Sequence, residues 1–361
     1  TSDEQIKLSF GEEKFDELLL PGETYVYPLY IEQTDGTLAP LTDEHLDELR
    51  LRAEVKDEQS SIASFEVEEE NDAYQLEVTT EAGWPTAQDE VEGVIKAVKR
   101  SNGKVVGSVD ADLTVGYPTI SDEALEAAKD GEYVFVESAT PVISTKQFEA
   151  LDGYADGGKV TFTNGMWTYE VRVSGQEAVN MLYNERAIRE VSSKFEDQNF
   201  MYVSFPGGPA FDFTGTMTID VSEVMEDFGG NFHVYRYLRG VLEKIDATVD
   251  ADNETVSFET KNLGRFVLTD KEIADGTVVD KSFVSQPQQP SQDQPTQNGG
   301  VSNEDQSNQE SNQQTGSVSD SNDYQSGKAN PETGAEDFVG LAAAGAVAAA
   351  AAGAVLFRKR K

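Results

Sequence analysis

Apolar and polar residues alternate in short segments through the first 118 residues of the chain. This period-two pattern, which places one face of a strand against a core, occurs at residues 6–10, 25–30, 62–67 and 74–78. Segments 92–98 and 105–115 flank Ser101-Asn102-Gly103, a strong signal for a β-hairpin turn. Regularly spaced short strands with turn residues between them predict that residues 1–118 form an immunoglobulin-like β-sandwich.

Residues 119–284 are predicted to form a second domain that is rich in β-strands. The turn residues Gly116-Tyr117-Pro118 mark its start, and Asn164-Gly165 predicts a hairpin inside it. Short helices are expected at residues 122–129, after the capping residue Ser121, and from Thr145. One long helix is predicted at residues 176–195, because apolar residues recur there at spacings of three and four, at Ile188, Val191 and Phe195.

The composition changes between residues 285 and 329. Gln, Ser, Asn, Pro, Gly and Asp dominate, and large apolar residues almost disappear. Such a segment cannot bury enough apolar surface to offset the entropy lost on ordering, so a disordered linker is predicted. A flexible coil of about 45 residues averages about 40 Å end to end and extends to about 150 Å.

The last residues combine an apolar span with a basic end. Residues 338–357 carry no charge, and a helix of about 20 residues spans about 30 Å, the thickness of the hydrocarbon core of a bilayer. Four cations follow at once, and positive charge is retained on the cytoplasmic side of a membrane. The predicted retention signal consists of Arg358, Lys359, Arg360 and Lys361.

The segment Asn330-Pro331-Glu332-Thr333-Gly334 precedes this span. Together the three elements, at residues 330–361, resemble the cell-wall sorting signal of Gram-positive surface proteins, usually written LPxTG. The resemblance implies that a sortase cleaves between Thr333 and Gly334 and joins Thr333 to the peptidoglycan precursor. Asn330 stands where Leu is usual, which leaves the class of sortase open. The alternative is a membrane anchor that is never cut.

The resemblance implies a secreted protein that is covalently attached to the cell wall after a transient membrane intermediate. The linker at residues 285–329 then has a purpose, which is to carry the folded domains through the wall. No basic start or apolar region of a signal peptide is visible at Thr1, and we expect the numbering to begin at or after the signal-peptide cleavage site.

Charge narrows the possible partners of the chain. Its 67 acidic and 28 basic residues give a formal net charge of −39. This field disfavours nucleic acids and anionic membranes, so contact with the membrane is expected only through the C-terminal span. The chain has no cysteine, which excludes disulfides, thiol nucleophiles and thiolate metal sites.

No catalytic residue and no cofactor are predicted. The two histidines, His45 and His233, are interpreted as surface residues, and no Gly-x-Ser-x-Gly elbow accompanies them. With 67 acids in the chain, pairs of carboxylates are guaranteed by number and do not by themselves indicate glycoside hydrolysis. We therefore expect no enzyme, and a glycan-active enzyme remains the alternative.

No metal site is predicted either. Residues 250–254 (Asp-Ala-Asp-Asn-Glu) and 110–112 (Asp-Ala-Asp) place oxygen ligands at alternate positions. Neither continues into the glycine and distal glutamate of a calcium-binding loop of the EF-hand type, and Asp-Asn-Glu between two strands is an ordinary turn.

The chain has two tryptophans that could contact a ligand. Trp167 alternates with Tyr169 and Val171 and is interpreted as a core residue. Trp84 lies in the turn Ala82-Gly83-Trp84-Pro85 and is the weak candidate for ligand binding, although packing is the favoured interpretation.

Two looser resemblances concern the folded region. Residues 131–137 followed by Pro141 faintly resemble the glutamate-bearing box of pilin domains that carry Lys–Asn isopeptide crosslinks. Residues 205–267 loosely resemble β-rich modules of uncharacterised Firmicute surface proteins, which implies no activity.

We interpret the chain as a surface protein that displays two β-rich domains for binding or adhesion to an extracellular protein or glycan. One alternative is an extracellular carbohydrate-active enzyme or its carbohydrate-binding accessory, favoured by a deep cleft with facing carboxylates and exposed aromatic side chains. Another is a structural pilus or stalk subunit, favoured by a covalent crosslink.

Overall fold

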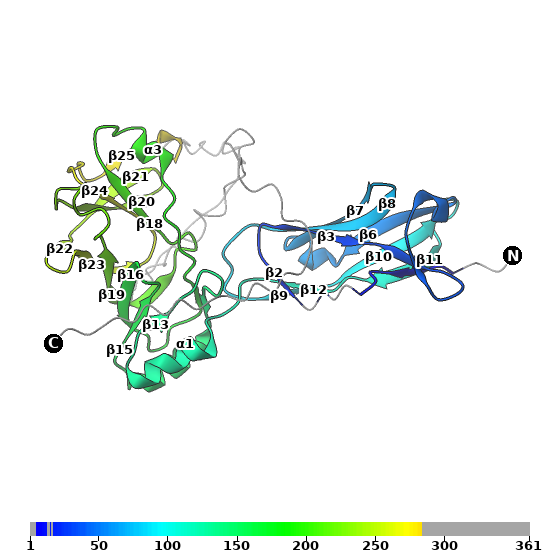
Figure 1. The fold of residues 1–361 in the computed structure, drawn as a ribbon, viewed down its shortest axis with the longest axis horizontal. Coiled ribbons are helices and arrows are strands. Elements are labelled where there is room, and N and C mark those ends of the chain that lie inside the picture. The colour runs from blue at the N-terminus through cyan, green and yellow to red at the C-terminus, as the bar shows by residue number, and fades with distance from the viewer. Residues whose placement is uncertain (1–4, 13–14, 16, 284–361) are drawn as a thin grey trace, which may run out of the picture.

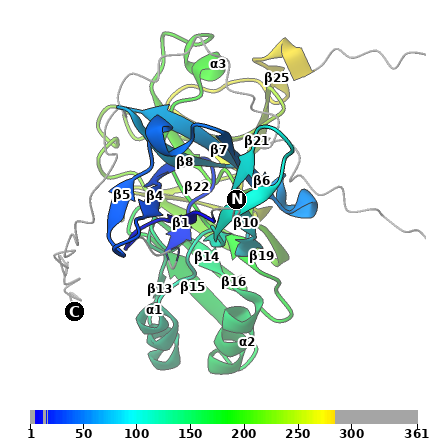
Figure 2. The same ribbon diagram turned by 90° about the vertical axis from the view of Figure 1, so that its right-hand side faces the viewer.

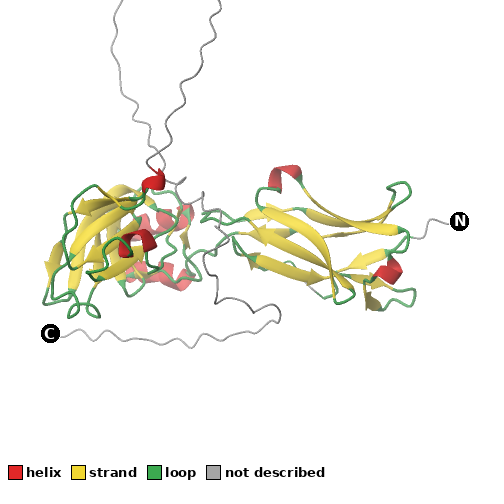
Figure 3. Ribbon diagram, turned by 90° about the horizontal axis from the view of Figure 1, so that it is seen from above, coloured by secondary structure: helices red, strands yellow, loops and turns green. Residues whose placement is uncertain are grey.

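The computed structural model describes residues 5–12, 15 and 17–283. The predicted linker at residues 285–329, the sorting motif at 330–334, the apolar span at 338–357 and the basic end lie outside the described residues. Among the described residues, no helix has the length and apolar character needed to cross a membrane. Strands dominate the described residues throughout (Figure 3). Figure 1 shows two parts placed end to end, with strands up to β12 in the first part and those from β13 onward in the second.

The first part consists of short strands arranged in four three-stranded sheets. The sheet orders are β1-β4-β5, β11-β10-β6, β2-β12-β9 and β3-β8-β7. All of the pairs are antiparallel except β2 with β12. The strands are β1 (Lys7–Ser9), β2 (Leu18–Leu19), β3 (Thr24–Pro28), β4 (Tyr30–Glu32), β5 (Leu38–Pro40), β6 (Leu49–Val55), β7 (Ala63–Glu70), β8 (Ala73–Thr80), β9 (Asp89–Val91), β10 (Gly93–Lys99), β11 (Val105–Asp110) and β12 (Leu113–Val115).

Local sequence signals account for much of this part. Strands β10 and β11 form the hairpin predicted around Asn102-Gly103, and Gly103 adopts φ 72°, which a residue with a Cβ adopts only at a cost. The helix expected after Thr42 is a single 3-10 turn at Asp43–His45. The alternation buries one face of each sheet, and the buried side chains from Leu8 to Val115 form one hydrophobic cluster. The immunoglobulin-like topology of this part stays a prediction.

The second part contains two larger sheets and the longest helices of the described residues. Its sheet orders are β13-β15-β16-β19-β23-β22, β18-β24-β20-β21-β25 and the pair β14-β17. The strands are β13 (Val134–Phe135), β14 (Val142–Ile143), β15 (Lys159–Thr163), β16 (Trp167–Arg172), β17 (Val179–Asn180), β18 (Phe200–Ser204), β19 (Ala210–Asp220), β20 (His233–Leu238), β21 (Val241–Ile245), β22 (Thr248–Asp250), β23 (Thr255–Asn262), β24 (Arg265–Thr269) and β25 (Thr277–Val278).

The helices of the second part are short. The structure contains α1 (Asp122–Ala127), α2 (Thr145–Tyr154) and α3 (Arg189–Ser192), and α1 and α2 lie together beside β13 and β15 (Figure 2). Ser121 caps α1 by accepting a hydrogen bond from the Ala124 amide, as predicted. Helix α2 begins after Ser144 and buries Phe148 and Leu151 on one face.

The long helix predicted at residues 176–195 is wrong. The segment forms strand β17, an irregular stretch and the single turn α3. The side chains of Asn180 and Asn184 accept hydrogen bonds from the backbone amides two residues further on, at Leu182 and Arg186. These local turns compete with helical hydrogen bonds. The buried stripe survives in part, because Ile188 and Val191 are buried while Phe195 packs partly buried beside them.

The cores of the two parts are separate clusters. The first cluster ends at Val115, and the next begins at Ile120 and contains Trp167, Tyr169 and Val171, as their alternation predicted. A third, smaller cluster packs between α3 and the β20-β24 region. Burial of these apolar side chains is the main contribution to the stability of each part.

Candidate functional site

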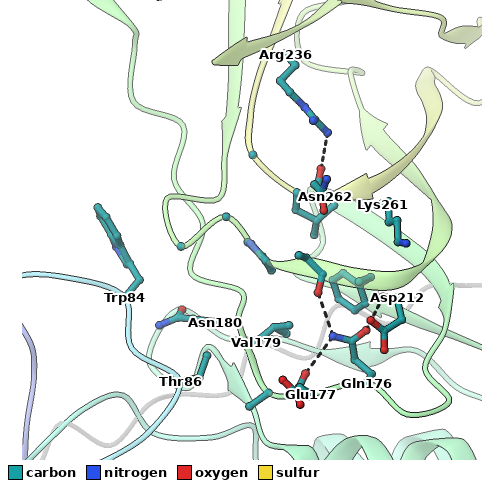
Figure 4. A pocket seen from close by; sticks show the side chains of 18 of the residues that line it. Trp84, Thr86, Gln176, Glu177, Val179, Asn180, Asp212, Arg236, Lys261 and Asn262 are labelled. Carbon is teal, nitrogen blue, oxygen red and sulfur yellow. Dashed lines mark hydrogen bonds between the residues drawn. The ribbon is translucent and has the colours of Figure 1, made fainter. Parts of the chain in front are cut away.

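A hollow among the described residues lies where the two parts meet. This junction groove has a volume of about 890 Å³ and is open to solvent. Trp84 and Thr86 of the first part contribute to it, and the second part supplies residues 175–180, 207–212, 236–238 and 261–264 (Figure 4). Clefts between structural units are a common location for ligand sites.

The floor of the junction groove is organised by Gln176. Its side chain is 5% exposed. Both N–H groups of the side-chain amide donate a hydrogen bond, and the carbonyl oxygen accepts one with one lone pair left over. Its Nε2 atom donates to the carbonyl oxygens of Glu177 and Ala210, each at 3.1 Å, and its Oε1 atom accepts from the Asp212 amide at 2.9 Å. The Gln176 amide therefore takes the place of a neighbouring strand, because it hydrogen-bonds to the backbone of β19 at the point where the β19–β23 register shifts.

Asn180 ties the two parts together. Its side chain is 2% exposed, and its Nδ2 atom donates to the Pro85 carbonyl oxygen at 3.1 Å. Gly207 allows this approach, because a Cβ atom there would lie 3.1 Å from the Asn180 carbonyl oxygen and 3.2 Å from the Trp84 Cβ. The loop at residues 84–85 is thus held directly against the second part.

Trp84 lies on the boundary between two hollows. It lines the junction groove and also a smaller pocket of about 300 Å³, formed mainly by residues 81–85 and 61–62 of the first part. The side chain is half-buried. Trp84 thus packs at the junction and borders both hollows.

Two cations face the junction groove. The Nη2 atom of Arg236 donates to Thr260 Oγ1 at 3.1 Å and to the Asn262 carbonyl oxygen at 2.9 Å. These bonds hold the guanidinium in place, while its remaining N–H donors have no partner among the described residues. Lys261 on β23 is exposed and forms no ion pair with any described residue.

Two carboxylates border the same groove, those of Glu177 and Asp212. Both side chains are exposed to solvent. The groove thus combines planar polar groups of both charges with exposed backbone at Gly207 and Gly208 and an aromatic side chain at one end. This arrangement suits binding of a polar, extended ligand.

The other candidate residues lie elsewhere. The Nδ1 atom of His45 accepts a hydrogen bond from the Thr42 amide at 3.1 Å, so it caps a turn, and His233 is a half-buried residue of β20. Asp250 accepts hydrogen bonds from the Asp252 and Asn253 amides, as an ordinary turn does. No group of three or more His, Cys, Asp or Glu residues suited to hold a metal occurs in the part of the chain that the structure describes.

The segment that resembles a pilin box does not have the surroundings of a crosslink. Glu132 and Glu137 are both exposed, and among the described residues no lysine is buried. Attack of a lysine on an asparagine amide needs an uncharged amine, a state that burial favours. The second part therefore lacks a buried lysine that could take part.

Sequence reasoning identified Trp84 and missed Gln176, Asn180, Arg236 and Lys261. The first two were assigned to the predicted long helix, and the two cations belong to ordinary strand patterns. One signal was available in the segment Pro206-Gly207-Gly208-Pro209, whose four turn-forming residues indicate a close approach of backbones.

Comparison with known proteins identifies the C-terminal end. Residues 331–361 match the family model of the LPXTG cell wall anchor motif. The match begins at Pro331, directly after Asn330. No curated protein matches the chain.

Three solved structures illustrate the distant likenesses. Domains 4 and 5 of the S-layer protein SbsC match 29% of this chain and 49% of that one, at 13% identity and a TM-score of 0.19. Domains 5–6 of SbsC match 72% of this chain and 85% of that one, at 8% identity and a TM-score of 0.19. The secreted serine protease VesC from Vibrio cholerae matches 76% of this chain and 48% of that one, at 11% identity and a TM-score of 0.21. The chain spans about half the length of the first and third structures, and TM-scores this low support neither a fold assignment nor a function.

The anchor motif determines where the protein resides. The chain is a secreted surface protein of a Gram-positive cell, covalently attached to the cell wall. Sortase and peptidoglycan are the partners that this motif implies.

Proposed function

We propose that this wall-anchored protein binds an extracellular ligand in the junction groove, without chemical conversion of that ligand. The observation that carries the proposal is that the groove is built jointly by the two parts. Trp84 comes from one part, and Asn180, Arg236 and Asn262 come from the other. The second part supplies most of the lining, and holding the parts together keeps Trp84 and Thr86 in the groove.

The folded region is proposed to consist of two domains, residues 1–118 and 119–284. The separate hydrophobic clusters support this division. Residues 285–329 would carry the domains through the wall, since a polar segment of this length reaches far beyond the surface of the anchor. Binding at a distance from the membrane is what adhesion requires.

The anchoring chemistry is assigned by resemblance to the end of the chain. Sortase recognition is proposed for the pentapeptide from Asn330 to Gly334, and linkage to peptidoglycan for the Thr333 carboxyl group. The cations Arg358 to Lys361 would retain the tail during processing.

The groove is expected to be preorganised for its ligand. Gln176 and Asn180 are fully buried and hydrogen-bonded before any ligand arrives. Groups that are held in place in advance lose little entropy on binding. Pocket shape and hydrogen bonding, in place of a conformational change, would then set the affinity.

The experiment uses a soluble chain that ends at Thr333, the product that sortase cleavage would leave. An array of glycans and matrix proteins is probed with this chain and with Trp84→Ala. Tyr133→Ala is the control, because Tyr133 is another exposed aromatic residue, 60% exposed and outside the groove lining. Binding that is lost in the Trp84 variant and retained in the control supports the proposal. A ligand bound equally by all three chains contradicts it.

One observation favours the enzymatic alternative, namely that Glu177 and Asp212 border the same groove as Trp84. Paired carboxylates are the groups that hydrolyse glycosidic bonds. Incubating each glycan that binds with the native chain, with Glu177→Gln and with Asp212→Asn separates the two functions. Release of reducing sugar that disappears in both variants would establish an enzyme, whereas binding without release establishes a binding protein.

A further inference from the structure

The charges in the junction groove carry an inference about the chemistry of its ligand, and this inference rests on the proposed function. We propose that the groove binds an acidic saccharide, and that Arg236 recognises the carboxylate of that saccharide. Lys261 adds a second positive charge to the same site, and the carboxylates of Glu177 and Asp212 also line the groove.

The first step concerns the state of Arg236. An arginine side chain remains charged under all physiological conditions. This one is half-buried and forms no ion pair with any described residue, although the chain as a whole carries a net charge of −39. Glu243 lies opposite Arg236 on the neighbouring strand β21 but forms no ion pair with it, and a partly buried charge without a counter-charge in contact is unfavourable. Pairing with an anionic ligand would relieve this cost.

The second step concerns geometry. Thr260 Oγ1 and the Asn262 carbonyl oxygen both accept from the same guanidinium nitrogen, Nη2. Thr260 Oγ1 in turn donates to the Asn262 carbonyl oxygen at 2.8 Å, which fixes the acceptors. The Nε and Nη1 donors remain. Both parallel-bonding edges of a guanidinium include Nη2, so each remaining donor gives a carboxylate a single charge-assisted hydrogen bond.

The third step concerns the class of ligand. The apolar side chains in the floor of the groove are packed into the core, since Val179, Phe211 and Leu263 are 4%, 2% and 1% exposed. A peptide that binds by inserting apolar anchors finds no open apolar pocket there. The accessible groups are instead Thr86, Asn262, glycine backbone and the exposed carboxylates of Glu177 and Asp212, with Trp84 across the groove from Arg236 (Figure 4). Hydroxyl groups and sugar rings match this surface.

The test measures binding by titration calorimetry at constant salt. The probes are tetragalacturonic acid, 3′-sialyllactose and a hyaluronan tetrasaccharide, each compared with its own carboxyl methyl ester, together with a hexaglutamate peptide. We expect at least one acid to bind about tenfold more tightly than its ester, as the loss of a charge-assisted hydrogen-bonded pair implies.

The variants assign this preference to a residue. Arg236→Gln is expected to remove the difference between acid and ester, Arg236→Lys to retain part of it through charge alone, and Lys261→Gln to reduce it. The control is Arg186→Gln, which removes a charge from an exposed arginine outside the groove lining. Thermal unfolding of each variant verifies that the chain remains folded.

Each other outcome overturns the inference in a distinguishable way. If acid and ester bind equally and binding still depends on Trp84, the groove is a glycan site that does not recognise the carboxylate. Binding of hexaglutamate alone, with loss in Arg236→Gln, makes the ligand an acidic peptide. If none of the saccharides binds, the proposal of an acidic saccharide ligand is wrong. The array experiment with the Trp84 variant then shows whether the groove binds any other ligand.

Discussion

The Nδ2 atom of Asn180 lies 3.1 Å from the Pro85 carbonyl oxygen, and this hydrogen bond joins residues 95 positions apart in the sequence. The Oδ1 atom of the same side chain accepts from the Leu182 amide at 3.0 Å. One buried amide therefore shapes the floor of the groove and attaches the other part of the molecule to it. The relative position of Trp84 and Arg236 depends on this contact.

Replacing this amide is expected to loosen the junction. In Asn180→Ala, the Pro85 carbonyl and the Leu182 amide both lose their partner, at a cost of about 1–3 kcal/mol for a buried polar group left unsatisfied. Small-angle X-ray scattering should show a broader distribution of distances between the two parts, and denaturant unfolding should show the lower stability. The control is Asn231→Ala, because Asn231 is exposed and, among the described residues, its side chain bonds only to the Gly229 carbonyl nearby. A scattering curve identical to that of the native chain would contradict the assigned role.

A glycine in α2 offers a gain in stability. Gly153 lies in the last turn of α2, its φ is not in the left-handed region, and a Cβ atom there would meet no atom within 4 Å. Gly153→Ala is expected to raise the free energy of unfolding by about 0.5–1 kcal/mol, because alanine loses less backbone entropy in a helix. Gly131→Ala should instead destabilise the protein, since Gly131 ends the preceding helix at φ 72°. Denaturant titration of both variants measures the two opposite effects.

Carboxylates on the outer face of the β3-β8-β7 sheet make the stability of the fold depend on pH. Glu77 lies directly opposite Glu66. Burial raises the pKa of Glu77, and the carboxylates of Glu68 and Glu66 raise it further. A carboxyl pKa that is higher in the folded state stabilises the fold fully below the pKa of the unfolded chain, and this contribution is lost as the pH rises through the folded value.

Glu77→Gln is therefore expected to stabilise the protein at pH 7 and to have little effect at pH 3.5. The gain at pH 7 should be about 0.2–1 kcal/mol, the range for a pair of like charges directly across two strands. Glu259→Gln provides the control, because Glu259 lies opposite the uncharged Thr216. Thermal unfolding at both pH values measures the difference, and an equal gain at pH 3.5 would show that charge is not the cause.

Processing of the C-terminal end is testable on cells. Muramidase should release wall fragments that carry this polypeptide ending in Thr333, linked to peptidoglycan. Thr333→Ala should abolish that linkage and shift the protein to the membrane fraction, whereas Thr315→Ala, in the preceding linker, should leave it unchanged. Wall fragments that never contain the chain would mean that the anchor is not cut.

Local patterns predicted most of the strands and the tight turns. Alternation in residues 62–67 and 74–78 corresponds to β7 and β8, and Asn164-Gly165 connects β15 with β16 in the predicted hairpin. Strand β6 was missed. The helix at residues 176–195 failed because the decisive interactions of Asn180 and Asn184 are turns, and Asn184 also pairs with Ser204, twenty residues away.

The sequence alone determined the anchor, the mainly β composition of the folded region and the identity of its buried faces, because these depend on residues close together in the chain. Only the tertiary structure decided that Trp84, Asn180 and Arg236 surround one groove. They belong to three separate segments, and their meeting depends on how two independently packed cores are placed against each other. No local periodicity records that placement, since it results from a few long-range contacts such as that between Asn180 and Pro85.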